Sequence, residues 1–148
     1  MRVLLVDDHA LFLEGLQNLL TARGVAVVGT AADGREALAQ ARALRPDVIL
    51  MDVRMPRCDG LAATRLIKAE LPEIKVVMLT TSAEDEDLFD AVRSGASGYL
   101  LKDLRADAFL DLLAGLARGE APLSPGLAGR VVLHSVFGRL DGEDSEDL

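Results

Sequence analysis

The sequence has 148 residues, of which 50% are hydrophobic and 3% aromatic, and its formal net charge is −8. This length suits a single domain with an aliphatic core, while the negative charge argues against direct binding of nucleic acid, because phosphates attract basic surfaces. The single cysteine excludes an intrachain disulfide. No apolar run is long enough to cross a bilayer, and the sequence runs from Met1 directly into the first predicted strand, without a signal-peptide pattern. We therefore expect a cytoplasmic protein with no membrane partner.

The first half of the sequence alternates between strand and helix patterns. Strands are predicted over residues 1–6 and 25–31. A helix separates these two strands, and a capping box formed by Asp33 and Glu36 predicts the start of the next helix. An uninterrupted apolar run that ends at Asp52 then predicts a third strand, buried on both faces, as is typical of parallel sheets.

The second half continues the same alternation. A helix is predicted over residues 61–71, a strand over 74–79, a helix capped by Ser82 with Asp85, and a strand over 97–101. A fifth helix then follows, with apolar residues on one face at Phe109, Leu112, Leu113 and Leu116. Because strand and helix alternate five times, the sequence predicts an α/β fold, a three-layer sandwich around a parallel five-stranded sheet.

Polar side chains stand at the expected carboxyl ends of four strands. In chain order they are Asp7 with Asp8, Asp52, Thr80 and Lys102. Parallel sheets bind ligands beyond these strand ends, so we expect the side chains to meet at one edge. Crowded carboxylates favour a bound cation, and Mg²⁺ is a hard ion that prefers oxygen ligands. Lysine and a hydroxyl can hold phosphoryl oxygens, while an aspartate can be the nucleophile that forms an aspartyl phosphate.

Each of these residues has a simpler interpretation when taken alone. Asp7 and Asp8 would suit the start of the first helix, where the helix dipole favours acidic residues. Lys102 would suit a solvated surface position. The presence of all five residues at the ends of alternating elements favours the phosphoryl-transfer interpretation over these alternatives.

Several motifs carry a resemblance to a known family. They are Val6-Asp7-Asp8-His9, the run from Pro46 to Pro56, Asp59-Gly60, Leu79-Thr80 and the run from Gly98 to Asp103. With these motifs the sequence resembles the receiver domain of two-component response regulators, in particular the NarL/FixJ (LuxR-type) subfamily. The resemblance implies a flavodoxin-like (βα)5 fold whose strands lie in the order 2-1-3-4-5.

The resemblance also implies how the acceptor and the metal would be held. Asp52 would accept a phosphoryl group from the phosphohistidine of a sensor histidine kinase. Asp8, Asp52 and the backbone carbonyl of Arg54 would bind Mg²⁺ directly, and Asp7 would act through water. The implied protein is a signalling domain that carries out only its own phosphorylation and dephosphorylation, and not an enzyme.

Two further positions are implied to switch the domain. Lys102 and Thr80 would hold the phosphoryl oxygens. Movement of Thr80 would be coupled to Tyr99 and would remodel the surface of the fourth helix, the fifth strand and the fifth helix. A phosphoryl group adds about two negative charges, which is enough to bias an element with two stable arrangements.

The character of the sequence changes after Gly119. Ser124 is expected to cap a linker helix whose apolar stripe consists of Leu133, Val136, Phe137 and Leu140. We expect a receiver over residues 1–120, and a linker helix with an acidic tail over 121–148, with no DNA-binding domain present. The linker helix is too short to be stable alone, so it must pack on the receiver, on a second copy or on a domain outside this chain.

The implied output is transcription, through a helix-turn-helix domain outside this chain, and the implied assemblies include a homodimer. A stand-alone receiver that acts by protein contacts or phosphorelay is the alternative. A phosphatase of the haloacid dehalogenase type is disfavoured, because its Asp-x-Asp spacing is absent from Asp7-Asp8-His9. An interaction module with a decayed site is disfavoured because all five site positions are intact.

Overall fold

The computed structural model describes residues 1–82, 84–127 and 129. The strands are β1 (Arg2–Val6), β2 (Ala26–Ala31), β3 (Val48–Asp52), β4 (Lys75–Thr80) and β5 (Gly98–Leu101). The helices that follow them in turn are α1 (Ala10–Ala22), α2 (Gly34–Leu44), α3 (Gly60–Glu70), α4 (Asp85–Arg93) and α5 (Ala106–Leu116). The predicted alternation is therefore confirmed. Within the described part of the chain, no helix has the length and apolar character that a membrane crossing requires.

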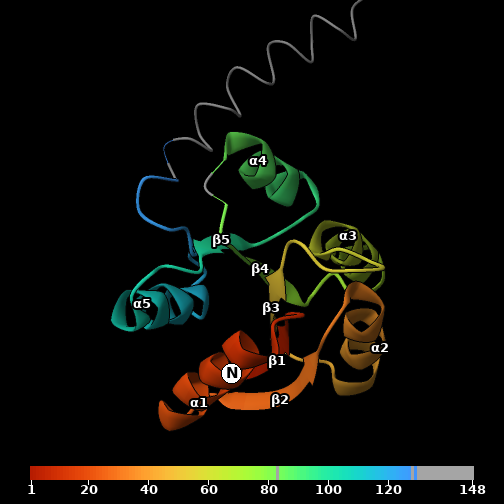
Figure 1. Cartoon of the computed structure of the whole chain (residues 1–148), viewed down its shortest axis with the longest axis horizontal. Helices are drawn as coiled ribbons and strands as arrows, with labels where there is room; N and C mark the ends of the chain where they lie inside the picture. Colours follow the sequence, from red (N-terminus) through yellow and green to blue (C-terminus); the bar gives the residue numbers. More distant parts are fainter. Residues whose placement is uncertain (83, 128, 130–148) are drawn as a thin grey trace, which may run out of the picture.

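The strands form one parallel sheet in the order β2-β1-β3-β4-β5 (Figure 1). The order reverses at β1, which pairs with β2 on one side and with β3 on the other. This confirms the flavodoxin-like fold that the family resemblance implied. The carboxyl ends of β1 and β3 lie side by side at the point of reversal, which is where open α/β sheets bind ligands.

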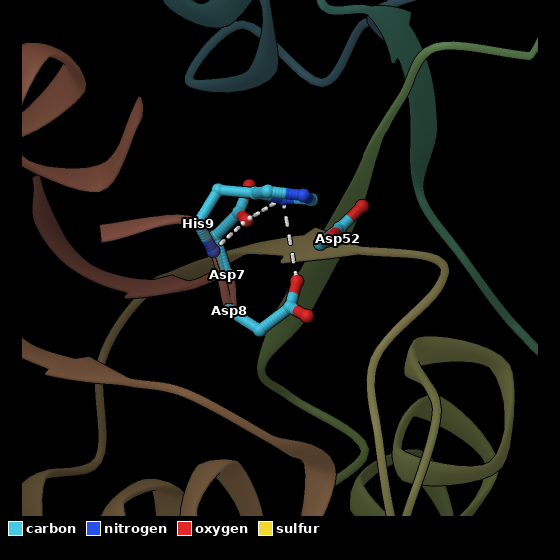
Figure 2. A group of neighbouring side chains, drawn as sticks. All are labelled: Asp7, Asp8, His9 and Asp52. Atoms are coloured by element: carbon cyan, nitrogen blue, oxygen red, sulfur yellow. Dashed lines mark hydrogen bonds and ion pairs between the residues drawn. The ribbon is translucent and has the colours of Figure 1, made fainter. Parts of the chain in front are cut away.

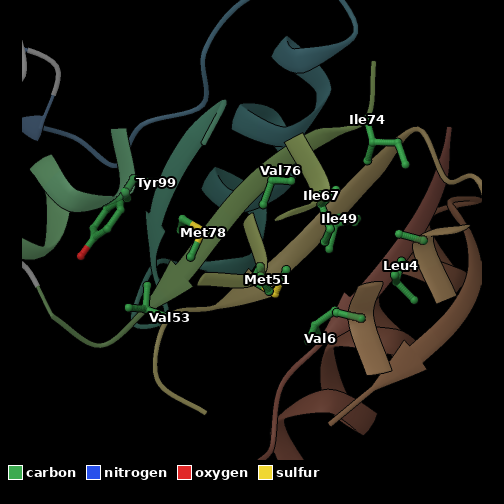
Figure 3. Close-up of a cluster of buried hydrophobic side chains, with 14 of the residues drawn as sticks. Leu4, Val6, Ile49, Met51, Val53, Ile67, Ile74, Val76, Met78 and Tyr99 are labelled. Atoms are coloured by element: carbon green, nitrogen blue, oxygen red, sulfur yellow. The ribbon is translucent and has the colours of Figure 1, made fainter. Parts of the chain in front are cut away.

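Helices cover both faces of the sheet (Figure 1). A separate apolar cluster fills each interface. One cluster joins α1 and α5 to the sheet and includes Leu20, Leu50 and Leu113. The other joins α2, α3 and α4 to the opposite face and includes Ile49 and Ile67 (Figure 3). Consecutive residues of β3 contribute to opposite clusters because side chains alternate across a strand. This double burial explains why the β3 sequence is apolar throughout until Asp52.

The start of α4 differs from the sequence prediction. Glu84 occupies the N-cap position, and none of the described side chains caps the helix there. The prediction that Ser82 is the N-cap of this helix is therefore wrong, while the side chain of Asp85, its predicted capping partner, lies outside the described part of the structure. The Ser82 hydroxyl accepts a hydrogen bond from the Glu84 backbone N at 3.2 Å and donates one to Asp87 at 2.6 Å. It thus links the loop to the first turn of α4 from a position two residues upstream of the N-cap.

A segment after α5, the C-terminal strap (residues 121–127), folds back against the open edge of β5. The Tyr99 N donates to the Pro122 carbonyl at 2.9 Å, and the Ser124 N donates to the Tyr99 carbonyl at 3.1 Å. The Ser124 hydroxyl accepts a hydrogen bond from the Leu101 N at 2.9 Å. Side chain and backbone of the strap therefore extend the hydrogen bonding of the sheet beyond β5.

The strap also contributes to the core. Leu127 is 2% exposed and belongs to the same apolar cluster as Tyr99. The packed core thus continues past the expected domain boundary at residue 120. The expected stripe at Leu133, Val136, Phe137 and Leu140 and the acidic tail lie outside the described residues.

Gly98 permits the close approach of the strap. A Cβ at Gly98 would lie 2.5 Å from the Pro122 carbonyl oxygen, so any side chain there must displace the strap. We expect Gly98→Ala to lower the free energy of unfolding by roughly 1–3 kcal/mol, which is the usual cost of overpacking a core. Urea denaturation of both proteins measures this difference. The matched control is Gly15→Ala on the exposed face of α1, where a Cβ meets nothing within 4 Å. That variant should not be destabilised, and equal stability of both variants would contradict the prediction.

Candidate functional site

Strands β1 and β3 bring three carboxylates together at the point where the strand order reverses (Figure 2). Asp7 and Asp8 directly follow β1, and Asp52 is the last residue of β3. One side-chain ligand atom from each of Asp7, Asp8, His9 and Asp52 lies within 4.8 Å of the others. His9 was present in the first sequence motif but received no role there. Its Nδ1 lies 3.0 Å from Asp7 Oδ1 and 3.3 Å from Asp8 Oδ1.

Asp52 is a buried carboxylate with one oxygen left unpaired among the described residues. Its residue is 5% exposed, and its Oδ2 is buried without a hydrogen-bond partner among the described residues. Burial raises the pKa of Asp52 to about 6, with repulsion from Asp7 adding to the rise and attraction by Lys102 opposing it. Because an unpaired buried carboxylate oxygen is costly, the site favours a cation, a proton or another donor beside Oδ2.

Lys102 supplies the positive charge of the site. Its Nζ lies 2.6 Å from Asp7 Oδ2 and 3.4 Å from Asp52 Oδ1, and the side chain is 11% exposed. The Phe12 ring of α1 lies 4.6 Å from the same nitrogen, a cation–π contact. One ammonium group is thus shared by two buried carboxylates and covered by an aromatic ring. The sequence pattern indicated Lys102 but gave no role to Phe12.

Thr80 and Tyr99 both form hydrogen bonds to Ser82 in the loop between β4 and α4. Thr80 ends β4 and is 3% exposed, and its Oγ1 accepts a hydrogen bond from the Ser82 N at 3.1 Å. Tyr99 is 1% exposed, and its hydroxyl donates to the Ser82 carbonyl at 2.8 Å. The structure therefore connects the two expected switch residues through one intermediate residue.

The loop after β3 approaches the site closely. The Gly60 N donates to the Val53 carbonyl at 2.8 Å, and a Cβ at Gly60 would collide with the Asp52 carbonyl. Only glycine therefore allows α3 to begin this near to Asp52. Arg54 lies in the same loop, and its guanidinium donates to Asp87 of α4 at 2.8 Å. The family resemblance implied a role only for the backbone carbonyl of Arg54, and none for Asp87.

The fold and the site agree with a known family. Residues 3–114 match the response regulator receiver domain. The transcriptional regulatory protein YxjL of Bacillus subtilis (strain 168) is 42% identical over 132 residues, which cover 88% of this chain and 61% of YxjL. The chain belongs to the receiver domain family of two-component response regulators, as its motifs indicated. It spans about three-fifths of the length of the curated relatives that it matches first (61% and 60%).

Solved structures support the same assignment. A LuxR-family two-component response regulator from Aurantimonas sp. SI85-9A1 has a TM-score of 0.84 and 32% identity, covering 91% of this chain and 97% of that chain. The isolated receiver of RcsB from Salmonella enterica serovar Typhimurium, solved with the phosphomimetic BeF3−, has a TM-score of 0.79 and 25% identity, covering 88% and 97%. Another structure holds RcsB dimers bound to DNA. The predicted kinship with LuxR/NarL-type receivers is confirmed.

The raised pKa of Asp52 predicts how stability depends on pH in metal-free buffer. Between about pH 4 and 6 the folded state holds a proton on Asp52 that the unfolded state releases. The free energy of unfolding of the protein therefore falls as the pH rises through this range. We expect Asp52→Asn to remove this contribution and to be more stable at pH 7 by on the order of 2 kcal/mol. Urea denaturation in the presence of a chelator, from about pH 4 to 7, measures the difference between the two proteins.

The control for this experiment is Asp111→Asn, which changes an exposed residue of α5. Its pH profile should run parallel to that of the unmodified protein. If the difference between unmodified protein and Asp52→Asn stays constant over this pH range, Asp52 does not titrate there, and the prediction is wrong.

Proposed function

We propose that this domain accepts a phosphoryl group on Asp52 from the phosphohistidine of a sensor histidine kinase. The observation that carries the proposal is a buried carboxylate at the end of β3 with Oδ2 unpartnered among the described residues and Lys102 beside Oδ1. With a pKa of about 6, this carboxylate is mostly ionised near pH 7, as a nucleophile must be. In the transfer, an Asp52 oxygen forms the bond to phosphorus, the phosphorus–nitrogen bond breaks, and the imidazole keeps the electron pair.

The acidic cluster is the proposed site of Mg²⁺, whose charge would offset the carboxylates and the phosphoryl oxygens during transfer. Asp8 and Asp52 would bind it directly, with the backbone carbonyl of Arg54 as a third protein ligand. Two observations support this assignment: Asp52 Oδ2 is buried without a partner among the described residues, and the Asp8 side chain is 31% exposed and thus accessible. Asp7 is already paired with Lys102, which suits a role through water.

Lys102 and Thr80 would hold the oxygens of the phosphoryl group. The Thr80 hydroxyl accepts its hydrogen bond from Ser82, so its own proton remains available for a phosphoryl oxygen. Movement of Thr80 would be transmitted to Ser82 and from there to the hydroxyl of Tyr99. The surface built by α4, β5 and α5 would then change, which is the proposed switch.

The proposed output is control of transcription through a helix-turn-helix domain outside this chain. YxjL, of which this chain spans 61%, is described as a transcriptional regulatory protein. A sensor kinase and a second copy of the chain are the proposed partners, in the cytoplasm, and we propose no direct contact of this chain with DNA. A stand-alone receiver that acts by protein contacts or phosphorelay is the second candidate, which the length of the matched relatives disfavours.

Phosphoryl uptake tests the acceptor assignment. Incubation with acetyl phosphate and Mg²⁺ should add one phosphoryl mass to the protein, as measured by intact-protein mass spectrometry. Asp52→Asn should abolish the addition because the nucleophilic oxygen is lost, whereas Asp111→Asn should leave it unchanged. A phosphoryl mass that persists in Asp52→Asn, or that maps to Ser82 in peptide analysis, would refute Asp52 as the acceptor.

Asp8 tests the metal assignment. We expect Asp8→Ala to slow Mg²⁺-dependent phosphorylation by at least about tenfold, as the loss of groups in a metal site does. In metal-free buffer the same variant should be at least as stable as the unmodified protein, because the change removes a charge that repels Asp52. The exposed residue Glu14 of α1 provides a control as Glu14→Ala. An unchanged Mg²⁺ dependence in Asp8→Ala would mean that the acidic pair only precedes a helix.

A further inference from the structure

Asp87 is a buried acidic residue of α4 that connects two loops of the site. Its side chain is 10% exposed, and its two oxygens have different partners. Oδ1 accepts a hydrogen bond from Arg54 Nη2 at 2.8 Å, and Oδ2 accepts one from Ser82 Oγ at 2.6 Å. We call these two hydrogen bonds the Asp87 bridge. A carboxylate this buried is tolerated because both of its oxygens are paired, and removing it leaves both partners without their acceptor.

Ser82 extends the bridge to both switch residues. Besides the hydrogen bond to Asp87, its hydroxyl accepts one from the Glu84 N at 3.2 Å. Its backbone N is bonded to Thr80 Oγ1, and its carbonyl is bonded to the Tyr99 hydroxyl. All four polar contacts of this residue are therefore fixed. The place of Ser82 determines where the acceptor for the Tyr99 hydroxyl lies.

Tyr99 donates its hydroxyl proton to that acceptor. The residue is 1% exposed and belongs to the apolar cluster that also contains Leu88 and Ala91 of α4 (Figure 3). A phenol hydroxyl that is buried must keep a hydrogen-bond partner, or the ring turns outward to reach water. Loss of the Ser82 carbonyl from its present position therefore favours exposure of the ring.

We propose that Asp87 is a positioning residue of the switch: the Asp87 bridge fixes Ser82 and thereby keeps Tyr99 buried before any phosphoryl group is present. The regulatory meaning of this arrangement rests on the proposed function, in which Thr80 and Tyr99 are the switch. The bridge begins at Arg54, whose backbone carbonyl is a proposed metal ligand. Metal binding and burial of Tyr99 are thus coupled, and such coupling is reciprocal.

Tyr99 is the only tyrosine of the chain, which has no tryptophan, so tyrosine fluorescence reports on this one side chain. We expect Asp87→Ala to raise the acrylamide quenching constant about twofold or more, since losing a hydrogen bond to a charged group shifts a two-state equilibrium by about tenfold. Asp87→Asn, which retains one acceptor oxygen, should give an intermediate value. The matched control is Asp90→Ala on the same helix, which removes an ion pair with Arg93 and should leave quenching unchanged.

Arg54→Gln tests the other end of the bridge without touching the core, because the Arg54 side chain is 76% exposed and the backbone carbonyl is retained. Quenching should rise as in Asp87→Ala, and the double variant should show no further rise, since residues that act through one contact are not additive. In the unmodified protein Mg²⁺ should change the quenching constant, and in Asp87→Ala this response should be lost.

These outcomes separate the bridge from the proposed function. All quenching measurements use unphosphorylated protein, while the function is tested by phosphoryl uptake on Asp52. Unchanged quenching in folded Asp87→Ala and Arg54→Gln would overturn the role of Asp87, even if Asp52 is phosphorylated normally. An equal rise in Asp90→Ala would overturn it as well. A rise confined to the bridge variants would support the role of Asp87, whether or not Asp52 accepts a phosphoryl group.

Discussion

The site depends on an imbalance of charge at the end of the sheet. Asp7 and Asp52 are both buried, and Lys102 is the cation that contacts them, at 2.6 Å and 3.4 Å. The fold forces this proximity, because β1 and β3 are neighbours whose carboxyl ends meet where the strand order reverses. One ammonium group cannot neutralise two buried carboxylates and the nearby Asp8. The remaining negative charge favours a bound cation beside these carboxylates.

The same edge of the sheet connects this chemistry to the surface. The Ser82 carbonyl accepts a hydrogen bond from the Tyr99 hydroxyl, and the Ser82 N donates one to Thr80 Oγ1. On the other side, the strap forms hydrogen bonds with the backbone of Tyr99. Tyr99 is therefore bound through its side chain to the loop before α4 and through its backbone to the end of the described chain. A displacement of Tyr99 would therefore alter its contacts with the loop before α4, with β5 and with the strap together.

The sequence was informative where local pattern and burial act together. The apolar run before Asp52 predicted a central strand correctly, and Asp33 caps its helix as expected by accepting from the Glu36 N at 2.9 Å. The cap predicted at Ser82 was wrong because the helix begins later, with Glu84 at the N-cap position. The Ser82 hydroxyl instead donates to Asp87, a partner that no local pattern reveals. The strap and the cation–π contact of Phe12 were missed for the same reason, since both depend on residues distant in sequence.

The position of the strap has a consequence for self-association. A sheet edge with free backbone N–H and carbonyl groups is a template for strands of other molecules, and natural proteins cover or interrupt such edges. β5 is the outermost strand on its side, and the strap satisfies the Tyr99 backbone there. A chain shortened before Pro122 would present that edge uncovered, beside the apolar surface that Leu127 now buries. The strap thus covers an edge of the sheet that would otherwise be open to strands of other molecules.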